Sequence, residues 1–420
     1  MKKWFLGVKN KIQGEKPQKL QEFLRANPLI VIICCIFGLA IFLRLWQISV
    51  IPGGFSEYER QAVDQLLKFN KNNLWLGGEF DKAAYLHLAF FVTKIFGLKI
   101  IVLRILSAII GSLTVVMLYV FISQWFSKKV AVFASLLLAI SAFHITLSRL
   151  ILPDIMFPLI LLIIFSTITL AYRTKNPWYF GISGMLVGLG FYTSPAFLFI
   201  PILFAVSAIY FYLKNKKFLT IYKKELLVAV VGFLAVIAPF LVSFTREPMA
   251  YLTHFGFYRS PWQLVMNVGQ IPNLLFFGTP KEAFSHLGTE PLVDPFIFVT
   301  ATSGFLLALF SITRRKYFFL VFWVVFLTLY AALKRGVQAT DLIGILPALY
   351  VMAALMIDYV LVKWLETFPL NKNARLLIVA VFSLLFALSG LYNFDQYFVA
   401  YKNSKDVKTE FSAKSPIPLK

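Results

Sequence analysis

The chain has 420 residues, of which 59% are hydrophobic and only 14% are charged, and its formal net charge is +22. A soluble domain carries roughly 25% charged residues, so this composition excludes an ordinary water-soluble enzyme and indicates a surface that mostly faces lipid. The basic residues stand between apolar segments rather than along one solvated face. This pattern argues against nucleic acid as a partner and indicates membrane lipids with anionic headgroups instead.

About eleven apolar stretches are long enough to cross about 30 Å of hydrocarbon as helices. They are residues 28–48, 100–124, 130–147, 154–172, 178–193, 195–213, 226–244, 295–312, 317–332, 342–362 and 376–392. The shorter apolar segment 83–96, interrupted by Lys94, is predicted to be an interfacial or re-entrant helix. The predicted fold class is therefore all-α: a polytopic transmembrane helical protein of about eleven spans, with juxtamembrane helices in the first outer loop. The adjacent Cys34 and Cys35 are predicted to be packing residues rather than a disulfide.

The basic residues of the short loops predict the orientation. The loops rich in Lys and Arg, predicted to be cytoplasmic, are 1–27, 128–129, 173–175, 214–224, 314–316 and 363–375. The alternate loops, predicted to be extracytoplasmic, are 51–99, 148–153, 246–294 and 334–341. This organisation gives a basic N-terminal segment (1–27), a transmembrane domain (28–398) and a polar C-terminal tail (399–420), which the count places outside.

Acidic residues are concentrated on the predicted outer side. Between residues 51 and 350 they are Glu57, Glu59, Asp64, Glu79, Asp81, Asp154, Glu247, Glu282, Glu290, Asp294 and Asp341, whereas the inner side carries only Glu225. Acidic residues contribute little to membrane orientation, so this skew needs another cause. Greater length of the outer loops explains acids such as Glu282 and Glu290 adequately. It explains Asp154 poorly, because Asp154 opens an apolar span directly after Pro153.

Two acids lie just after the first span, behind a turn rich in Pro and Gly. Residues 57–70 have helical periodicity, with Ser56 as the expected N-cap and Glu59 completing a capping box. Both Glu57 and Glu59 can therefore serve only to favour a helix N-terminus. Glu57 has the stronger claim to a functional role, because the capping box already accounts for Glu59.

Two further patches combine acids with cations at the expected lipid surface. Asp81 and Lys82 precede the 83–96 segment; they form either an idle surface ion pair or a clamp for a phosphate headgroup. His87, farther along that segment, is expected to be a packing residue. Arg149 and Asp154 flank a short turn between two spans. Asp154 can be a helix cap, but ionisable residues at this depth are costly unless they face a polar cavity or a partner.

The order of these features resembles the GT-C superfamily of membrane glycosyltransferases, in the branch of protein mannosyltransferases and the lipid A aminoarabinose transferase. In that branch an acidic pair follows the first span, where this chain has Ser56 and Glu57. An acid-Lys-Pro element is matched here by Asp81-Lys82-Ala83. An Asp-Pro that opens the fourth span is matched by the inverted Pro153-Asp154. The 188–195 turn and the segment from Arg335 to Pro347 are also similar, so the resemblance covers residues 28 to 362.

The resemblance implies an extracytoplasmic glycosyltransferase in a cell membrane. Its partners would be a polyprenyl-phosphate-linked sugar donor and a lipid, glycan or protein acceptor. Such a donor is already activated, so no nucleotide-binding motif is needed, and the chain contains none. One carboxylate must take the proton of the acceptor hydroxyl, and cations must offset charge on the departing phosphate. The sequence requires no cofactor and predicts no metal ligands, although a divalent cation remains compatible with this chemistry.

We therefore predict Glu57 as the catalytic base and Asp154 as its partner. The residues predicted to bind the donor or its phosphate are Asp81, Lys82, Arg149 and Arg335. The alternative function is a transporter or flippase of a lipid-linked or polar solute, which typically has ionisable residues near the bilayer midplane. Mid-span positions here are almost free of acids, and Asp358 lies near an inner end. A non-catalytic scaffold for an envelope glycan complex is a third interpretation.

Overall fold

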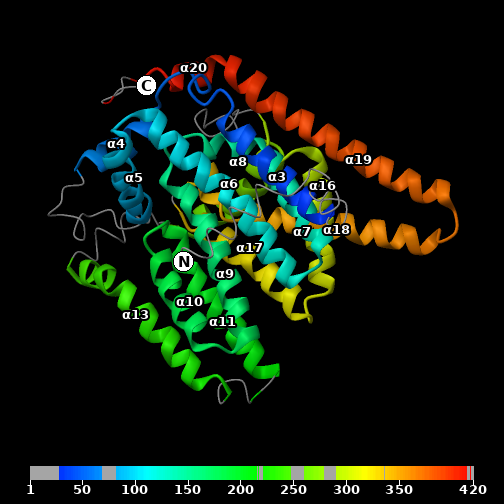
Figure 1. The fold of residues 1–420 in the computed structure, drawn as a ribbon. Coiled ribbons are helices and arrows are strands. Elements are labelled where there is room, and N and C mark those ends of the chain that lie inside the picture. The colour runs from blue at the N-terminus through cyan, green and yellow to red at the C-terminus, as the bar shows by residue number, and fades with distance from the viewer. Residues whose placement is uncertain are drawn as a thin grey trace, which may run out of the picture.

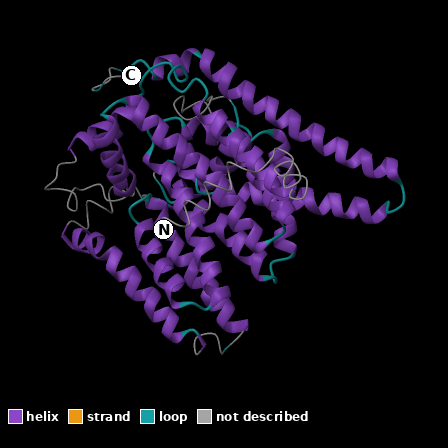
Figure 2. Ribbon diagram, viewed as in Figure 1, coloured by secondary structure: helices purple, strands orange, loops and turns teal. Residues whose placement is uncertain are grey.

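The computed structural model of this chain describes residues 28–68, 82–214, 216, 221–246, 260–278, 290–334, 336–413 and 417. Within these ranges the chain is helical and contains no strand, apart from one isolated bridge between Phe55 and Ser412 (Figure 2). This confirms the predicted all-α class.

The helices of the first half are α3 (Pro28–Leu45), α4 (Glu57–Lys68), α5 (Ala83–Phe96), α6 (Ile100–Trp125), α7 (Lys128–Ile140), α8 (Ala142–Ser148), η3 (Pro153–Ile155), α9 (Met156–Thr174) and α10 (Pro177–Gly190). Those that follow are η4 (Pro195–Phe199), α11 (Ile200–Lys214), α13 (Lys223–Arg246), α15 (Pro261–Phe276), α16 (Pro295–Phe310), α17 (Arg315–Ala332), η5 (Ala339–Leu342), α18 (Leu346–Thr367), α19 (Lys372–Phe394), the π-helix η6 (Asp395–Tyr401) and α20 (Lys405–Glu410).

Each predicted apolar stretch falls on a helix or on consecutive helices. In the described ranges, eight helices are long and apolar enough to cross a membrane, or nine if the bent pair α7–α8 forms one span. The remaining predicted spans correspond to α10 and α16, which have only 14 and 16 residues. The polytopic architecture is therefore confirmed. The count of about eleven includes two helices shorter than a usual span.

The predicted span 130–147 bends by 63° between α7 and α8. Ser141 stands at the break, where its side-chain oxygen accepts a hydrogen bond from the backbone N–H of His144. A helix end leaves carbonyl groups without intrahelical partners. The buried Arg44 supplies the missing donors at this helix end. Its guanidinium donates to Leu138 O at 3.4 Å and to Ala139 O at 3.2 Å. This buried arginine therefore stabilises a break that the apolar pattern does not reveal.

Glycines allow two helix pairs to approach closely. A Cβ atom at Gly184 of α10 would lie 1.9 Å from the carbonyl oxygen of Ala229 on α13. A Cβ atom at Gly304 of α16 would lie 2.0 Å from the carbonyl oxygen of Met352 on α18. Close backbone contact through small residues is typical of helices that associate in membranes, where packing replaces the hydrophobic driving force.

The connections sort into two ends of the helix bundle. At one end, named here the α4 end, lie α4 and the C-terminal segment with α20 (Figure 1). The turn that follows α8 is bonded to α4 there, through Ile151 and Glu59. Here Tyr58 of α4 donates to Gln338, in the connection after α17, at 3.0 Å. At the opposite end, Tyr210 and Lys214 both donate to Thr313 O, at 2.6 and 2.7 Å. This grouping agrees with the two sets of loops that the basic residues predict. Which end faces the cytoplasm stays a prediction.

The C-terminal segment returns to the first loop. The backbone N–H of Phe55 donates to Phe411 O at 3.0 Å, and that of Ala413 donates to Phe55 O at 3.1 Å. A Cβ atom at Gly54 would lie 1.9 Å from Phe411 O, so this approach requires glycine. The segment around residue 411 therefore lies at the α4 end, as the predicted placement of the tail requires.

The prediction that Cys34 and Cys35 are packing residues is wrong. Both are free thiols and both are exposed on the surface of α3. In that helix only 22% of the spanning window is buried inside the protein. An apolar stretch in a membrane protein does not distinguish residues packed against helices from residues facing lipid, because both environments favour apolar side chains.

Candidate functional site

The site begins at the N-terminus of α4, which folds as its sequence predicts. The side-chain oxygen of Ser56 accepts from the backbone N–H of Glu59 at 3.2 Å. Oε2 of Glu59 in turn accepts from the backbone N–H of Ser56 at 3.3 Å. This confirms the capping box and fixes where α4 begins. Glu57 consequently occupies the first position of the helix.

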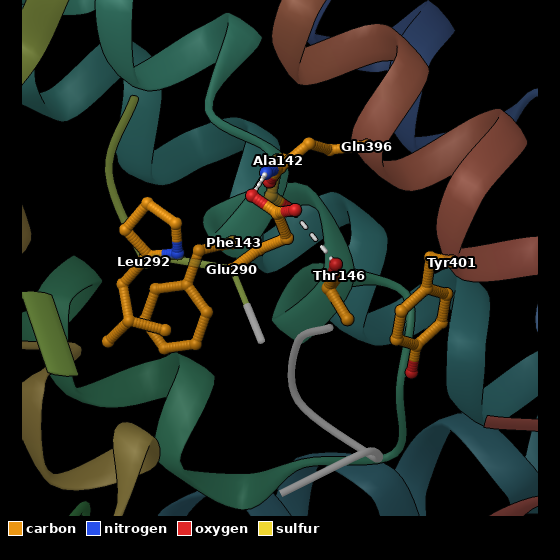
Figure 3. A pocket seen from close by; sticks show the side chains of 8 residues that line it. Ala142, Phe143, Thr146, Glu290, Leu292, Gln396 and Tyr401 are labelled. Atoms are coloured by element: carbon orange, nitrogen blue, oxygen red, sulfur yellow. Dashed lines mark hydrogen bonds between the residues drawn. The ribbon is translucent and has the colours of Figure 1, made fainter. Parts of the chain in front are cut away.

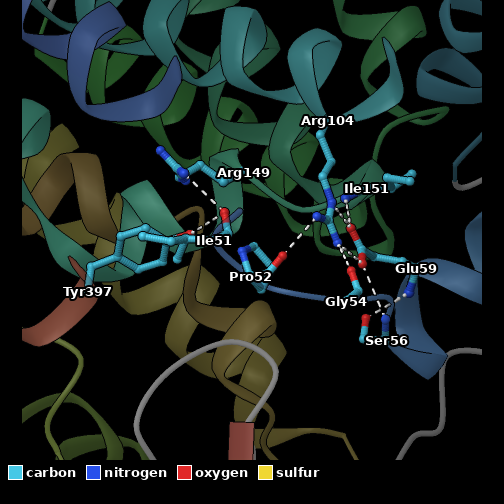
Figure 4. A network of polar contacts seen from close by, with 9 residues as sticks. All are labelled: Ile51, Pro52, Gly54, Ser56, Glu59, Arg104, Arg149, Ile151 and Tyr397. Carbon is cyan, nitrogen blue, oxygen red and sulfur yellow. Dashed lines mark hydrogen bonds and ion pairs between the residues drawn. The ribbon is translucent and has the colours of Figure 1, made fainter. Parts of the chain in front are cut away.

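The other function of Glu59 is a buried ion pair. Arg104 Nε donates to Glu59 Oε1 at 2.8 Å, and Arg104 Nη2 donates to Glu59 Oε2 at 2.7 Å. The same guanidinium donates to the carbonyl oxygens of Pro52 at 3.2 Å and Gly54 at 2.6 Å. Glu59 Oε1 also accepts from the backbone N–H of Ile151 at 3.1 Å (Figure 4). One carboxylate thus joins the first loop, α6 and the turn that leads to Asp154.

Arg149 is the second buried guanidinium at this end, and its side chain has no exposed surface. It donates to four backbone carbonyls, those of Leu43, Arg44, Trp46 and Ile51. Its guanidinium carbon also lies 5.2 Å from the ring centre of Tyr397 and 5.4 Å from that of Phe398. In this structure Arg149 binds the end of α3 and the following turn. Direct contact with a lipid phosphate, which the sequence predicts, would require these bonds to break.

Glu57 differs from its neighbour Glu59. Its side chain is 49% exposed, and its Oε1 accepts from Arg60 Nη2 at 2.6 Å. This hydrogen bond and the charge of Glu57 raise the pKa of Arg60. Glu59 is 1% exposed and fully engaged. Of the two acids in the first patch, Glu57 is therefore the one that an incoming hydroxyl can reach.

Asp154 lies in the short helix η3, directly after Pro153, and is half-buried. The helix η3 contacts α5 and α6, whereas the adjacent turn is held to α4 through the bond between Ile151 and Glu59. Asp154 and Glu57 thus belong to separate segments that meet at the α4 end. Lys82 stands at the N-cap position of α5, which begins and ends as the apolar pattern predicts. Asp81 and Arg335, also predicted as site residues, lie outside the described residues.

A third segment reaches α4 through the bond between Tyr58 and Gln338. Lys334 Nζ donates to Asp341 Oδ1 at 2.6 Å, and the backbone N–H of Gln338 donates to Asp341 Oδ2 at 3.0 Å. Burial raises the pKa of Asp341, and the charge of Lys334 opposes this effect. The predicted outer segments with Glu57, with Asp154, and from 334 to 341 therefore meet at one end of the bundle.

No three His, Cys, Asp or Glu side chains gather as a metal site in the ranges that the structure describes. Carboxylates at the α4 end form ion pairs with cations: Glu57 with Arg60, Glu59 with Arg104, and Asp341 with Lys334. Chemically, the α4 end has an accessible carboxylate, Glu57, on a helix whose start is fixed by buried ionic contacts. This arrangement can hold a general base steady next to cations at the edge of the bundle.

Part of this chain matches a known protein family. A family model described as "Dolichyl-phosphate-mannose-protein mannosyltransferase" matches residues 84–242. A comparison with curated proteins gives no match. The matched residues run from α5 to α13 and include Arg149 and Asp154. Lys82, directly before α5, and the whole of α4 lie outside the match.

Two solved structures share the fold over nearly the whole chain. ArnT from Cupriavidus metallidurans bound to undecaprenyl phosphate has a TM-score of 0.54 and 13% identity, covering 92% of this chain and 77% of its own. The Archaeoglobus fulgidus oligosaccharyltransferase AglB, in complex with an inhibitory peptide and a dolichol-phosphate, has a TM-score of 0.58 and 17% identity over 94% of this chain. The chain spans 61% of that protein's length. These matches show that the chain shares the fold of ArnT and AglB.

Two residues of the site, Arg104 and Tyr397, were not predicted from the sequence. Arg104 looks like an isolated charge near the start of a span, and nothing local pairs it with Glu59, which is 45 residues away. Tyr397, whose hydroxyl donates to Ile51 O at 3.5 Å, comes from the end of the last long helix. The positive charge of Arg104 inside an apolar helix is the one signal that a search for buried partners would have used.

Proposed function

We propose that this protein is an integral membrane glycosyltransferase that moves a sugar from a polyprenyl-phosphate-linked donor to an acceptor. The reaction takes place at the α4 end, which we propose is extracytoplasmic. The acceptor oxygen attacks the anomeric carbon, and the bond between that carbon and the phosphate oxygen breaks. The electron pair leaves with the polyprenyl phosphate, and the acceptor proton passes to a carboxylate, which corresponds to an inverting transfer.

One observation carries this proposal: the accessible carboxylate of Glu57 lies at the end of the bundle where the Asp154 turn also lies, held there by the buried pair of Glu59 and Arg104. Two comparisons support it independently. The matching family model is described as a mannosyltransferase that uses dolichyl phosphate mannose. The fold is shared with ArnT, whose structure contains undecaprenyl phosphate, and with AglB, whose structure contains dolichol-phosphate.

In this proposal Glu57 is the general base, and Asp154 orients the acceptor or a cation of the donor site. Lys82 and Arg335 contact the donor phosphate, because charge at headgroup depth needs cationic partners. Asp81 belongs to the same donor site, next to Lys82. Arg149 contributes by holding the turn at Ile51 against the end of α3. It has no free surface for the phosphate unless the turn opens.

The direct test uses the purified full chain in detergent with a polyprenyl-phosphate sugar labelled in the sugar. Release of free polyprenyl phosphate, above that from a mock preparation, is the expected result. The sugar and the natural acceptor are then sought by exchanging the donor and adding membrane extracts. Intact donor after prolonged incubation, over a panel of hexosyl and pentosyl donors with membrane extract present, would contradict the proposal.

A further inference from the structure

A polar pocket lies at the end of the bundle, between α8, the short segment 290–292 and the π-helix η6 (Figure 3). Its cavity volume is about 10 Å³, which is room for about one water-sized group. The residues that line it are Ala142, Phe143, Thr146, Glu290, Pro291, Leu292, Gln396 and Tyr401. Glu290 belongs to the second large loop predicted from the sequence, whose length alone explains an acidic residue there.

The carboxylate of Glu290 is only partly satisfied. Both donors that the structure gives it bind the same oxygen: the Tyr392 hydroxyl and Gln396 Nε2 each donate to Oε2 at 3.2 Å. Gln396 Nε2 also donates to the Tyr392 hydroxyl oxygen at 2.8 Å. Among the described residues, Glu290 has no ion pair, and its Oε1 has no donor. A carboxylate has about four lone-pair positions, so capacity remains on the side of the pocket.

Two further polar groups of the pocket, those of Thr146 and Gln396, leave acceptors rather than donors. The Thr146 hydroxyl donates to Ala142 O at 2.9 Å, so its lone pairs remain available. The Gln396 amide nitrogen must face Glu290, because a carboxylate only accepts hydrogen bonds, and this leaves the amide oxygen. A group that bonds to Glu290, Thr146 or the Gln396 amide oxygen must therefore donate hydrogen bonds. A phosphate, which brings negative charge and acceptors, does not match this chemistry.

The walls of the pocket are fixed by a second network. Asn393 Oδ1 accepts from the backbone N–H of Ala142 at 2.7 Å, and Asn393 Nδ2 donates to Asp294 Oδ2 at 2.7 Å. Asp294 in turn caps α16 through Ile297 N–H at 3.0 Å. The η6 wall is a π-helix, a rare form that is frequent at functional sites. The same π-helix carries Tyr397, which contacts Ile51 just before α4. The pocket is therefore built beside the candidate site rather than left by loose packing.

We propose that the Glu290 pocket binds a hydrogen-bond-donating group of the acceptor, a hydroxyl or an ammonium group, and excludes the phosphate of the donor. The inference rests on the glycosyltransferase function proposed above and adds the binding site of the second substrate. The role of Glu290 is recognition: its carboxylate accepts the donated hydrogen bond, and Gln396 and Tyr392 hold it in place.

The charge preference is tested without any assumption about activity. Thr146→Cys is made in the full chain with Cys34 and Cys35 replaced by Ala. The rates of modification by two small methanethiosulfonates, 2-aminoethyl and 2-sulfonatoethyl, are then compared. The measured quantity is the rate with the cationic reagent divided by the rate with the anionic reagent. We expect this ratio to be at least about tenfold higher at the introduced cysteine than for free cysteine in solution. Glu290→Gln should remove most of this preference. The ratio of rates cancels any change in the thiolate fraction of the cysteine. Equal preference with and without Glu290 would overturn the proposal.

Assignment to the acceptor is tested by donor binding. Glu290→Gln should bind a labelled polyprenyl-phosphate-linked sugar with the affinity of the parent protein, as should the matched control Glu366→Gln, an exposed acid on α18. Loss of donor affinity in Glu290→Gln alone would overturn the assignment, since the pocket would then serve the donor. If the parent protein does not release polyprenyl phosphate, the glycosyltransferase proposal is contradicted. The charge preference of the pocket, measured with the two reagents, does not depend on that outcome. Equal elution volumes of the variants in detergent exclude misfolding as a cause.

Discussion

Glu59 and Arg104 form a two-bond ion pair in which the carboxylate is 1% exposed and the guanidinium side chain 4% exposed. The pair is also bonded to the backbone of the first loop and of the turn before η3. Removing one partner of such a pair leaves an uncompensated buried charge, which is more costly than the loss of the bond itself. The pair therefore determines whether the segments with Glu57 and Asp154 stay together.

Arg104→Met is expected to destabilise the protein by about 3–5 kcal/mol, because Glu59 then remains charged and buried. Glu59→Gln should destabilise it similarly. The double variant should lose less than the sum of the two, since neither charge is left alone. The measurement is a denaturant titration in detergent. Lys363→Met, which breaks an exposed pair with Glu366, is the control and should change little. An additive double variant would contradict the interpretation of a coupled pair.

Glu57→Gln keeps the size of the side chain but cannot accept a proton. We expect transfer to fall by about 10²–10⁴-fold, the usual contribution of a general base, with donor binding retained. Initial rates of polyprenyl phosphate release measure this effect. Asp154→Asn should also lose activity, through misplacement of the acceptor or of a cation. If Asp154→Asn abolishes turnover while Glu57→Gln is near normal, the two roles are exchanged. Near-normal rates in both variants would leave this site without a base.

Lys82→Met is expected to weaken binding of the lipid-linked donor, because a point charge at the start of α5 is lost. The elution volume and stability of the variant should stay those of the parent protein. Binding of the labelled donor is compared with that of Lys94→Met, a lysine in the last turn of the same helix. Equal donor affinity in the two variants would mean that Lys82 does not bind the donor and is an ordinary lysine at the membrane surface.

Gly54→Ala is expected to release the C-terminal segment, because the added Cβ would lie 1.9 Å from the carbonyl oxygen of Phe411. Faster tryptic cleavage at Lys405 and Lys408 in α20 measures this release. Gly53→Ala is the matched control, since its Cβ would meet only Val50 O, at 3.4 Å. Equal cleavage rates in the two variants would mean that the pairing of Phe55 with Phe411 and Ala413 does not hold α20.

Single cysteines introduced in place of Glu57, Asp154 and Lys405 should be labelled from one side of the membrane. Cysteines in place of Lys128 and Lys316 should be labelled from the other side. The contacts at each end of the bundle support this division, and the basic loops predict that the second side is cytoplasmic. Cys34 and Cys35 are exposed and must be replaced first. Labelling of position 154 from the cytoplasm would contradict the proposed location of the site.

Local patterns predicted much of this protein. The start of α4 follows from Ser56 and Glu59, since a capping box is local, and α5 ends where the apolar run meets Gly97. The partners of buried charges were not predicted. Arg149 looked like a phosphate ligand because its sequence position is at a turn. Its four carbonyl partners come from residues 98 to 106 positions earlier in the chain. Pairing over such distances depends on how helices pack, which spacing in one sequence does not encode.

The contact between the turn at Ile51–Phe55 and the residues from Tyr397 to Ala413 also has a consequence for biogenesis. The turn follows α3 and is made early, whereas its partners are made some 350 residues later. Until they arrive, the carbonyl of Ile51 has only Arg149 as a donor, and both backbone groups of Phe55 have to be satisfied by water. The candidate site can therefore reach this arrangement only after α19 has been inserted. A nascent chain arrested before α19 should hold donor lipid poorly, even with all earlier helices in the membrane.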